Sequence, residues 1–97
     1  MAASLHDLAK VELNEAAQYY EQKSAGLGTA YVAEVERCTA AILEYPHAGP
    51  IVMGAIRRRS LQRFPYALLY RVKPEQVRIL AVMNLKRRPG YWIGTRT

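Results

Sequence analysis

The sequence predicts an α+β fold in which an N-terminal antiparallel helical hairpin packs on one face of a three- to four-stranded antiparallel sheet. Two observations lead to this expectation. Apolar residues recur at helical spacing in the first half of the chain and at alternate positions in the second half. The length of 97 residues suits one hydrophobic core, so we expect a single domain over residues 1–97.

The first predicted helix follows Asp7, the expected N-cap, and runs to about Lys23. Its apolar stripe steps by four, three and four residues through Ala9, Leu13, Ala16 and Tyr20. The glycine-containing segment 24–28 ends this pattern. Because the connection is so short, the next helix should return antiparallel to the first.

The second helix is expected from Leu27 or Thr29 to Tyr45, where Pro46 ends it. Its inward stripe contains Leu27, Tyr31, Val35, Cys38 and Ile42. The cysteine on this stripe is expected to be a core residue, and the inward-facing Tyr20, Tyr31 and Tyr70 are likewise expected in the core.

Strands are predicted from the point where the apolar spacing changes to two. We expect them at about 56–61, 66–72 and 77–84, the last two joined by a turn at residues 73–76. The run 80–83 is apolar on both faces, which predicts a central strand that is covered on each side. Residues 4–6 could add a short edge strand, and residues 46–54 are expected to form a loop.

Charge divides the chain into two halves. Residues 1–49 hold seven acids against three bases, a net charge of −4. Residues 50–97 hold eleven bases and one acid, Glu75, a net charge of +10. A cationic surface of this kind attracts an anionic partner, such as nucleic acid, the ribosome or an acidic protein.

Familiar catalytic and metal-binding patterns are missing from the sequence. It has no glycine-rich phosphate loop, no cysteine pair and no histidine pair at metal-ligand spacing, so we expect neither a cofactor nor a metal. His6 and His47 are expected to be ordinary surface residues. There is no apolar run long enough for a membrane span and no signal-peptide core, so we expect a cytoplasmic protein without membrane contact.

Two basic clusters are the candidate binding residues. The first is Arg57–Arg59 with Arg63 nearby. Strand alternation sends Arg58 to one face and Arg57 and Arg59 to the other, and some of these arginines could serve only to keep a sheet edge soluble.

The second cluster is Lys86, Arg87 and Arg88, followed by Tyr91 and Trp92. Arginine binds phosphate or carboxylate through a planar fork, and an adjacent aromatic ring can stack on a base or an apolar anchor. The alternative is a solvated tail whose Trp92 packs back on the sheet. An RNA-cleaving site could also be assembled here from Lys86, Arg87 and Tyr91 as base, phosphate-binding cation and proton donor.

The order of several short motifs resembles the ParE branch of the ParE/RelE toxin superfamily of bacterial type II toxin–antitoxin systems. The matching pieces are Glu15-Ala-Ala-x-x-Tyr20, Gly26-Leu-Gly28, Glu34-Val35, Tyr45-Pro46, Arg63-Phe-Pro-Tyr66 with Tyr70, and Ile79-Leu-Ala-Val82 through Arg87-x-Pro89-x-Tyr91-Trp92. The most specific are the phenylalanine-proline-tyrosine motif and the closing arginine-proline-tyrosine-tryptophan pattern. Together they cover nearly the whole chain.

This resemblance implies a RelE/ParE toxin-like fold and a toxin neutralised by a cognate acidic antitoxin, and it allows a toxin–antitoxin heterotetramer. ParE relatives poison DNA gyrase, whereas RelE relatives cut messenger RNA on the ribosome with arginine, lysine and tyrosine side chains. The chain has Asn84 where the ParE pattern has histidine, and Ala67 where RelE relatives have an arginine. Arg87 matches the C-terminal arginine of the family.

Three functions follow from the resemblance. The first is a non-enzymatic ParE-like toxin that binds gyrase, the second a RelE-like endoribonuclease, and the third an inactive relative that only binds antitoxin. The basic clusters together with Asn84, Tyr91 and Trp92 are the expected contacts with target or antitoxin. Because Ala67 removes a phosphate-binding charge, we expect binding rather than cleavage.

Overall fold

The computed structural model describes residues 1–88, 90–94 and 96. It contains two helices and five strands. In chain order they are β1 (Ala2–Leu5), α1 (Asp7–Lys23), α2 (Leu27–Glu44), β2 (Ile51–Met53), β3 (Ile56–Ser60), β4 (Tyr66–Val72) and β5 (Gln76–Asn84). The predicted α+β fold, its helical hairpin and its three main strands are confirmed. Pro89, within the predicted closing motif, lies outside the described residues.

The sheet differs from the prediction in its strand number and in one strand direction. Its order is β1-β5-β4-β3-β2, with five strands rather than three or four. The predicted edge strand exists as β1, but it pairs parallel to β5. The expected loop at 46–54 was partly wrong, since β2 pairs there with β3 around an irregular register. The sheet is therefore mixed, with antiparallel pairing across β2, β3, β4 and β5.

Local interactions explain the ends of the helices. His6, rather than the predicted Asp7, is the N-cap of α1, and its Nδ1 accepts a hydrogen bond from Leu8 N at 3.1 Å. Gly26 adopts φ +87° at the N-cap of α2, a conformation that favours glycine. Glu21 accepts hydrogen bonds from the amides of Gly26 and Gly28, which ties the hairpin turn to the end of α1.

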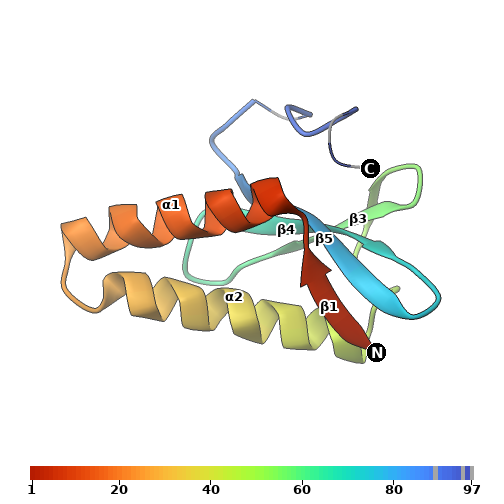
Figure 1. Cartoon of the computed structure of the whole chain (residues 1–97), viewed down its shortest axis with the longest axis horizontal. Coiled ribbons are helices and arrows are strands. Elements are labelled where there is room, and N and C mark those ends of the chain that lie inside the picture. Colours follow the sequence, from red (N-terminus) through yellow and green to blue (C-terminus); the bar gives the residue numbers. More distant parts are fainter. Residues whose placement is uncertain (89, 95, 97) are drawn as a thin grey trace.

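The two faces of the sheet carry separate apolar clusters. Both helices lie on one face, where Tyr31, Ile42 and Tyr70 are fully buried. We call the opposite side the open face because neither α1 nor α2 covers it. Its cluster joins Leu69, Leu80 and other strand residues to Trp92 of the C-terminal segment, by which we mean the residues after Asn84. Figure 1 shows this segment (blue) leaving β5 close to the start of α1.

The prediction that residues 80–83 are covered on both sides is confirmed. Leu80 and Val82 are each 1% exposed. Val82 belongs to the cluster under the helices and Leu80 to the cluster under Trp92. The register of β4 with β5 shifts between Leu69 and Tyr70, whose partners are Ala81 and Ile79, so Leu80 lies at the irregularity. The C-terminal segment, and not a second layer of helices, completes the burial of this strand.

Candidate functional site

The candidate site is built around the C-terminal half of β5, where β1 no longer pairs with the strand. The pairing with β1 ends at Ile79, and His6 N makes the last backbone hydrogen bond to Ile79 O at 2.8 Å. Beyond it, side chains take the place of a strand. Val82 N donates to Glu12 Oε1 at 3.0 Å, and Leu80 O accepts from Arg96 at 3.4 Å. The strand edge is thus closed by polar side chains rather than left open.

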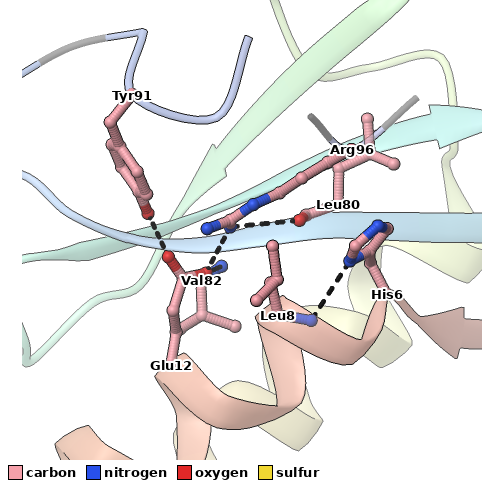
Figure 2. A network of polar contacts seen from close by, with 7 residues as sticks. All are labelled: His6, Leu8, Glu12, Leu80, Val82, Tyr91 and Arg96. Carbon is pink, nitrogen blue, oxygen red and sulfur yellow. Dashed lines mark hydrogen bonds and ion pairs between the residues drawn. The ribbon is translucent and has the colours of Figure 1, made fainter. Parts of the chain in front are cut away.

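Glu12 is the centre of this arrangement (Figure 2). Besides the hydrogen bond from the amide of Val82, its carboxylate accepts hydrogen bonds from the Tyr91 hydroxyl at 2.6 Å and from Arg96 at 2.7 Å. The Arg96 and Glu12 side chains are 8% and 11% exposed, so this ion pair lies largely out of water. A buried carboxylate is stable only when it is paired and hydrogen-bonded, and Glu12 has both kinds of partner. One side chain of α1 therefore anchors the C-terminal segment to the sheet.

The ring of Tyr91 lies beside two cations. The Arg87 guanidinium is 4.4 Å from the ring centre and that of Arg96 is 5.1 Å away, both within cation–π distance. Burial, followed by the hydrogen bond to the Glu12 carboxylate, raises the pKa of Tyr91 above its usual value. The Tyr91 hydroxyl is therefore committed as a hydrogen-bond donor to Glu12, and its ring orients Arg87.

Asn84 shapes the turn that follows β5. Its Oδ1 accepts from Lys86 N at 2.9 Å, and its backbone carbonyl accepts from Arg87 N at 3.0 Å. Its Nδ2 donates to the Tyr66 hydroxyl at 3.5 Å. The side chains of Lys86, Arg87 and Arg88 that follow are all exposed. Asn84 thus contributes to the site by presenting these three cations.

A small cavity of about 260 Å³ lies between the end of β5 and α1. Its polar lining residues are Glu12, Glu15, Tyr19, Tyr66, Asn84 and Arg87. Burial raises the pKa of Tyr66, and its hydroxyl accepts the hydrogen bond from Asn84 Nδ2. The cavity therefore offers hydroxyl and amide groups, one arginine and two carboxylates for polar recognition. Among the described residues, no cluster of histidine, cysteine and acidic side chains could hold a metal.

The structure separates the first basic cluster as strand alternation predicts. Arg57 and Arg59 lie on the helical side, where Arg57 donates to Gly49 O at 2.8 Å and to His47 O at 3.1 Å. Arg58 is exposed and lies on the open face, opposite Leu69 of β4. Arg63 stacks over Phe64 at 5.4 Å, next to α2. These four residues therefore do not form one site, and Arg57 holds a loop in place.

Trp92 and Ala67 are both core residues. Trp92 is 5% exposed and packs against the sheet, so it closes the open-face cluster rather than presenting an exposed ring. Ala67 is fully buried in the same cluster. Cys38 is buried as predicted, and burial raises the pKa of its thiol. Of the predicted contacts, the structure brings together Asn84, Arg87 and Tyr91.

Sequence reasoning missed Glu12 and Arg96, the two charged residues that hold the site together. Glu12 had a detectable signal, since it follows Ala9 by three residues and precedes Ala16 by four, which places an acid on the inward stripe. Arg96 had none, because its partner is 84 residues away in the chain. The site therefore depends on a long-range contact between the acidic and the basic half.

Comparison with known proteins identifies the family. The profile of the ParE toxin of type II toxin–antitoxin systems, parDE, matches residues 3–89. The chain belongs to this family. A solved structure of the chromosomal ParDE toxin–antitoxin system from P. aeruginosa contains a chain with the same fold, at a TM-score of 0.74 and 19% identity. The match covers 88% of this chain and 96% of that one.

The comparison with curated protein sequences gave no significant match. The ParE-type toxin assignment therefore rests on the family profile, and the ParDE structure supports the fold. No helix in the described part of the chain combines the length and apolar character that crossing a bilayer requires.

Proposed function

We propose that this ParE-type toxin acts by binding an essential bacterial complex, DNA gyrase, and that a cognate acidic antitoxin neutralises it. The observation that carries the proposal is the exposed cationic turn after β5, Lys86–Arg88. It follows a central strand of the sheet, and Arg87 is oriented by the ring of Tyr91. A group of exposed cations at the end of a buried strand suits recognition of an acidic surface without chemistry.

The geometry at Tyr91 favours binding over RNA cleavage. In a ribonuclease site Tyr91 would supply a proton beside Lys86 and Arg87. Here its hydroxyl donates to Glu12 at 2.6 Å, and the raised pKa makes it a weaker acid than an ordinary tyrosine. The buried Ala67 leaves a position without charge where ribonuclease relatives carry arginine. Both observations support the non-enzymatic function.

The antitoxin partner is supported by the family and by the charge distribution. The C-terminal half carries a net charge of +10, and an acidic partner that folds on binding would neutralise part of it. A heterotetramer of two toxins and two antitoxins is the assembly we propose. Its mass in solution, measured by light scattering of the co-purified proteins, tests this part of the proposal.

The target is tested by running two assays side by side with the purified chain: supercoiling by DNA gyrase and cleavage of messenger RNA in a translating ribosome extract. We expect inhibition of supercoiling and intact messenger RNA. Specific RNA cleavage with unaffected gyrase would instead identify an endoribonuclease. Binding of the antitoxin with no effect in either assay would identify a relative that retains only the antitoxin contact.

The contact surface is tested with Arg87→Ala combined with Arg88→Ala. Removing two charged contacts should weaken gyrase inhibition about tenfold or more. The matched control is Lys10→Ala with Lys23→Ala, which removes the same charge from exposed positions of α1. Circular dichroism checks the fold of both variants. Equal inhibition by the two double variants would show that the turn after β5 does not contact the target.

A further inference from the structure

We infer that the open face of the sheet holds a binding site for a small anion that carries two or more phosphate groups. The site consists of Arg58, Arg71 and Arg78, which we call the arginine row. It lies apart from the cationic turn Lys86–Arg88 and rests neither on the proposed target nor on the proposed antitoxin. Strand register, unused hydrogen-bond donors and charge each support it.

The register of the sheet places the three arginines next to one another. Arg71 of β4 lies directly opposite Arg78 of β5, at a Cβ separation of about 5 Å for such pairs. Arg71 also lies opposite Ile56 of β3, so Arg58, two residues further along β3, is its diagonal neighbour at about 7–8 Å. Ile56 and Leu69, the partners of Arg71 and Arg58, both belong to the open-face cluster. The row therefore crosses three neighbouring strands on one face.

Most hydrogen-bond donors of the row are unused among the described residues. Arg78 Nη1 donates to Ser4 Oγ and to Leu5 O, each at 3.2 Å, which leaves three of the five guanidinium donors. Arg71 makes no hydrogen bond or ion pair with any described residue. Gln76, two residues before Arg78, accepts from Ser4 through Oε1 at 2.8 Å, so its amide nitrogen adds two donors. A ligand that matches this cluster must supply acceptors.

Charge within the row opposes folding. Like charges directly opposite each other destabilise a sheet, and Arg71 and Arg78 are such a pair. In the part of the chain that the structure describes, neither of them nor Arg58 forms an ion pair with a carboxylate. The one acid of residues 50–97, Glu75, is exposed in the turn between β4 and β5. A bound anion would remove the repulsion between the two opposite arginines.

The charge and length of the row favour phosphate over carboxylate. A phosphate monoester carries a charge of about −1.5 to −2 and three acceptor oxygens, whereas a carboxylate carries a single charge and two oxygens. One phosphate would therefore bridge Arg71 and Arg78 and neutralise both. Arg58 belongs to the next strand, where a second phosphate group of the same ligand would reach it. A diphosphate thus matches the row better than a single phosphate does.

The surroundings of the row favour a small ligand over a nucleic-acid strand. Proteins that bind single strands stack the bases on exposed aromatic rings. The aromatic members of the open-face cluster are Trp92, which is buried, and Tyr91, whose ring contacts the guanidinium groups of Arg87 and Arg96. Both rings are occupied by contacts within the chain. The ligand would therefore be held by its phosphates, and a base attached to them would remain in solvent.

The row is also separate from the cationic turn after β5. Arg78 lies near the start of β5, and Lys86–Arg88 follow Asn84 at its end, roughly 20 Å further along the strand. A diphosphate bound at the row would not reach those cations. It would instead strengthen the link between the central strands and β1, because Arg78 already holds Ser4 and Leu5. We therefore expect binding to stabilise the fold.

The test adds sodium pyrophosphate to the full chain in a phosphate-free buffer, with sodium chloride at matched ionic strength as the control. At about ten times its dissociation constant, pyrophosphate should raise the melting temperature by about 5–10 °C. Amide NMR shifts should gather around Arg58, Arg71 and Gln76. Shifts confined to Lys86–Arg88, or equal effects of pyrophosphate and chloride, would overturn the inference.

Arg71→Gln tests the site with two measurements. Loss of one guanidinium should weaken pyrophosphate binding about tenfold. The same substitution removes the like-charge pair, so the ligand-free variant should melt about 1–4 °C higher than the unmodified chain. Lys10→Gln removes an equal charge from an exposed position of α1 and should change the affinity less than about twofold. Arg71→Lys keeps the charge without the planar fork, and its affinity should fall between the two. Unchanged affinity in both Arg71 variants would contradict the site.

Further ligands identify the source of the phosphate groups. Tighter binding of ADP than of pyrophosphate would identify a nucleotide as the ligand, and equal or weaker binding would identify an inorganic diphosphate; either result supports the site. A single-stranded DNA oligonucleotide or a polyglutamate peptide that binds more tightly than both, in an Arg71-dependent manner, would show that the face holds a macromolecule and that the small-ligand inference is wrong. Gyrase inhibition is measured separately, so failure of the proposed target leaves these results unchanged.

Discussion

The two faces of the sheet are covered in different ways. On the helical side, 35 residues of α1 and α2 pack over the strands, and Tyr20, Tyr31, Phe64 and Tyr66 form a group of contacting rings. On the open face the cover is the short C-terminal segment, with Trp92 as its apolar contact and Glu12 as its polar anchor. The helical side therefore carries the larger of the two apolar clusters. The open face carries a cover held by few side chains, and the candidate binding residues lie around it.

The largest expected difference comes from removing one aromatic residue from each face. Phe64→Ala should lower the free energy of unfolding by about 3–5 kcal/mol, because Phe64 is 7% exposed and its ring centre is 4.8 Å from that of Tyr20. Trp92→Ala should cost less, about 2 kcal/mol, because we expect the C-terminal segment to detach without unfolding of the helices. Urea unfolding followed by circular dichroism gives both values.

Hydrogen exchange separates local from global loss. With Trp92→Ala, the amides of β5 beyond Ile79 should exchange faster while those of α2 remain protected. If Trp92→Ala costs as much as Phe64→Ala and all amides lose protection together, the two faces form one cooperative unit. The distinction between a core and a detachable cover would then be wrong.

The next test removes the polar anchor, Glu12. Glu12→Ala should cost about 2 kcal/mol, since it removes the acceptor of Val82 N and the carboxylate that pairs with Arg96, whose side chain then reaches water as the C-terminal segment detaches. Glu15→Ala, at an exposed position one turn further along α1, should change stability by less than about 0.5 kcal/mol. The protection of the Val82 amide from hydrogen exchange measures the loss directly. Continued protection in Glu12→Ala would show that Glu12 is dispensable.

This contrast between faces also explains what the sequence could predict. The helices α1 and α2 follow from periodic apolar spacing over many residues, and the core positions of Tyr31 and Cys38 follow from the same pattern. Strand β2 was missed because it has three residues, flanked by Pro50 and Gly54, and all three are exposed. Because none of these residues is buried, buried and exposed side chains do not alternate there, and the two-residue spacing that indicates a strand is absent.

Long-range pairings were the other part that the sequence could not supply. The parallel pairing of β1 with β5 joins Ala2 to Gln76, and no local pattern fixes a partner so distant along the chain. The same holds for the contact of Glu12 with Arg96. The basic residues after β5 were predicted from their adjacency in the sequence and from the family motif. The contact of Arg87 with the Tyr91 ring became visible only when the fold brought α1 beside the C-terminal segment.

Alkaline pH should affect both faces through tyrosine. Burial raises the pKa of Tyr31 and Tyr70 on the helical side and of Tyr91 in the C-terminal segment. A pKa raised by folding gives stability that is complete below the unfolded pKa of about 10 and is lost as the pH rises above it. Each tyrosine that stays neutral only in the folded state then costs about 1.4 kcal/mol for each pH unit above that value. Unfolding free energies should be flat from neutral pH to about 9 and fall steeply beyond.

The smallest expected effects come from removing one hydroxyl from each face, and they should differ in sign. Tyr91→Phe deletes the donor to Glu12 and should cost about 1–2 kcal/mol, because the carboxylate loses a partner in a half-buried place. The Tyr31 hydroxyl is buried and has no hydrogen-bond partner among the described residues. Tyr31→Phe should therefore be neutral or stabilise the protein by up to about 1 kcal/mol. Thermal unfolding of the two variants at neutral pH gives the comparison. Equal losses would mean that the Tyr31 hydroxyl stabilises the protein as much as the Tyr91 hydroxyl does, which would contradict this prediction.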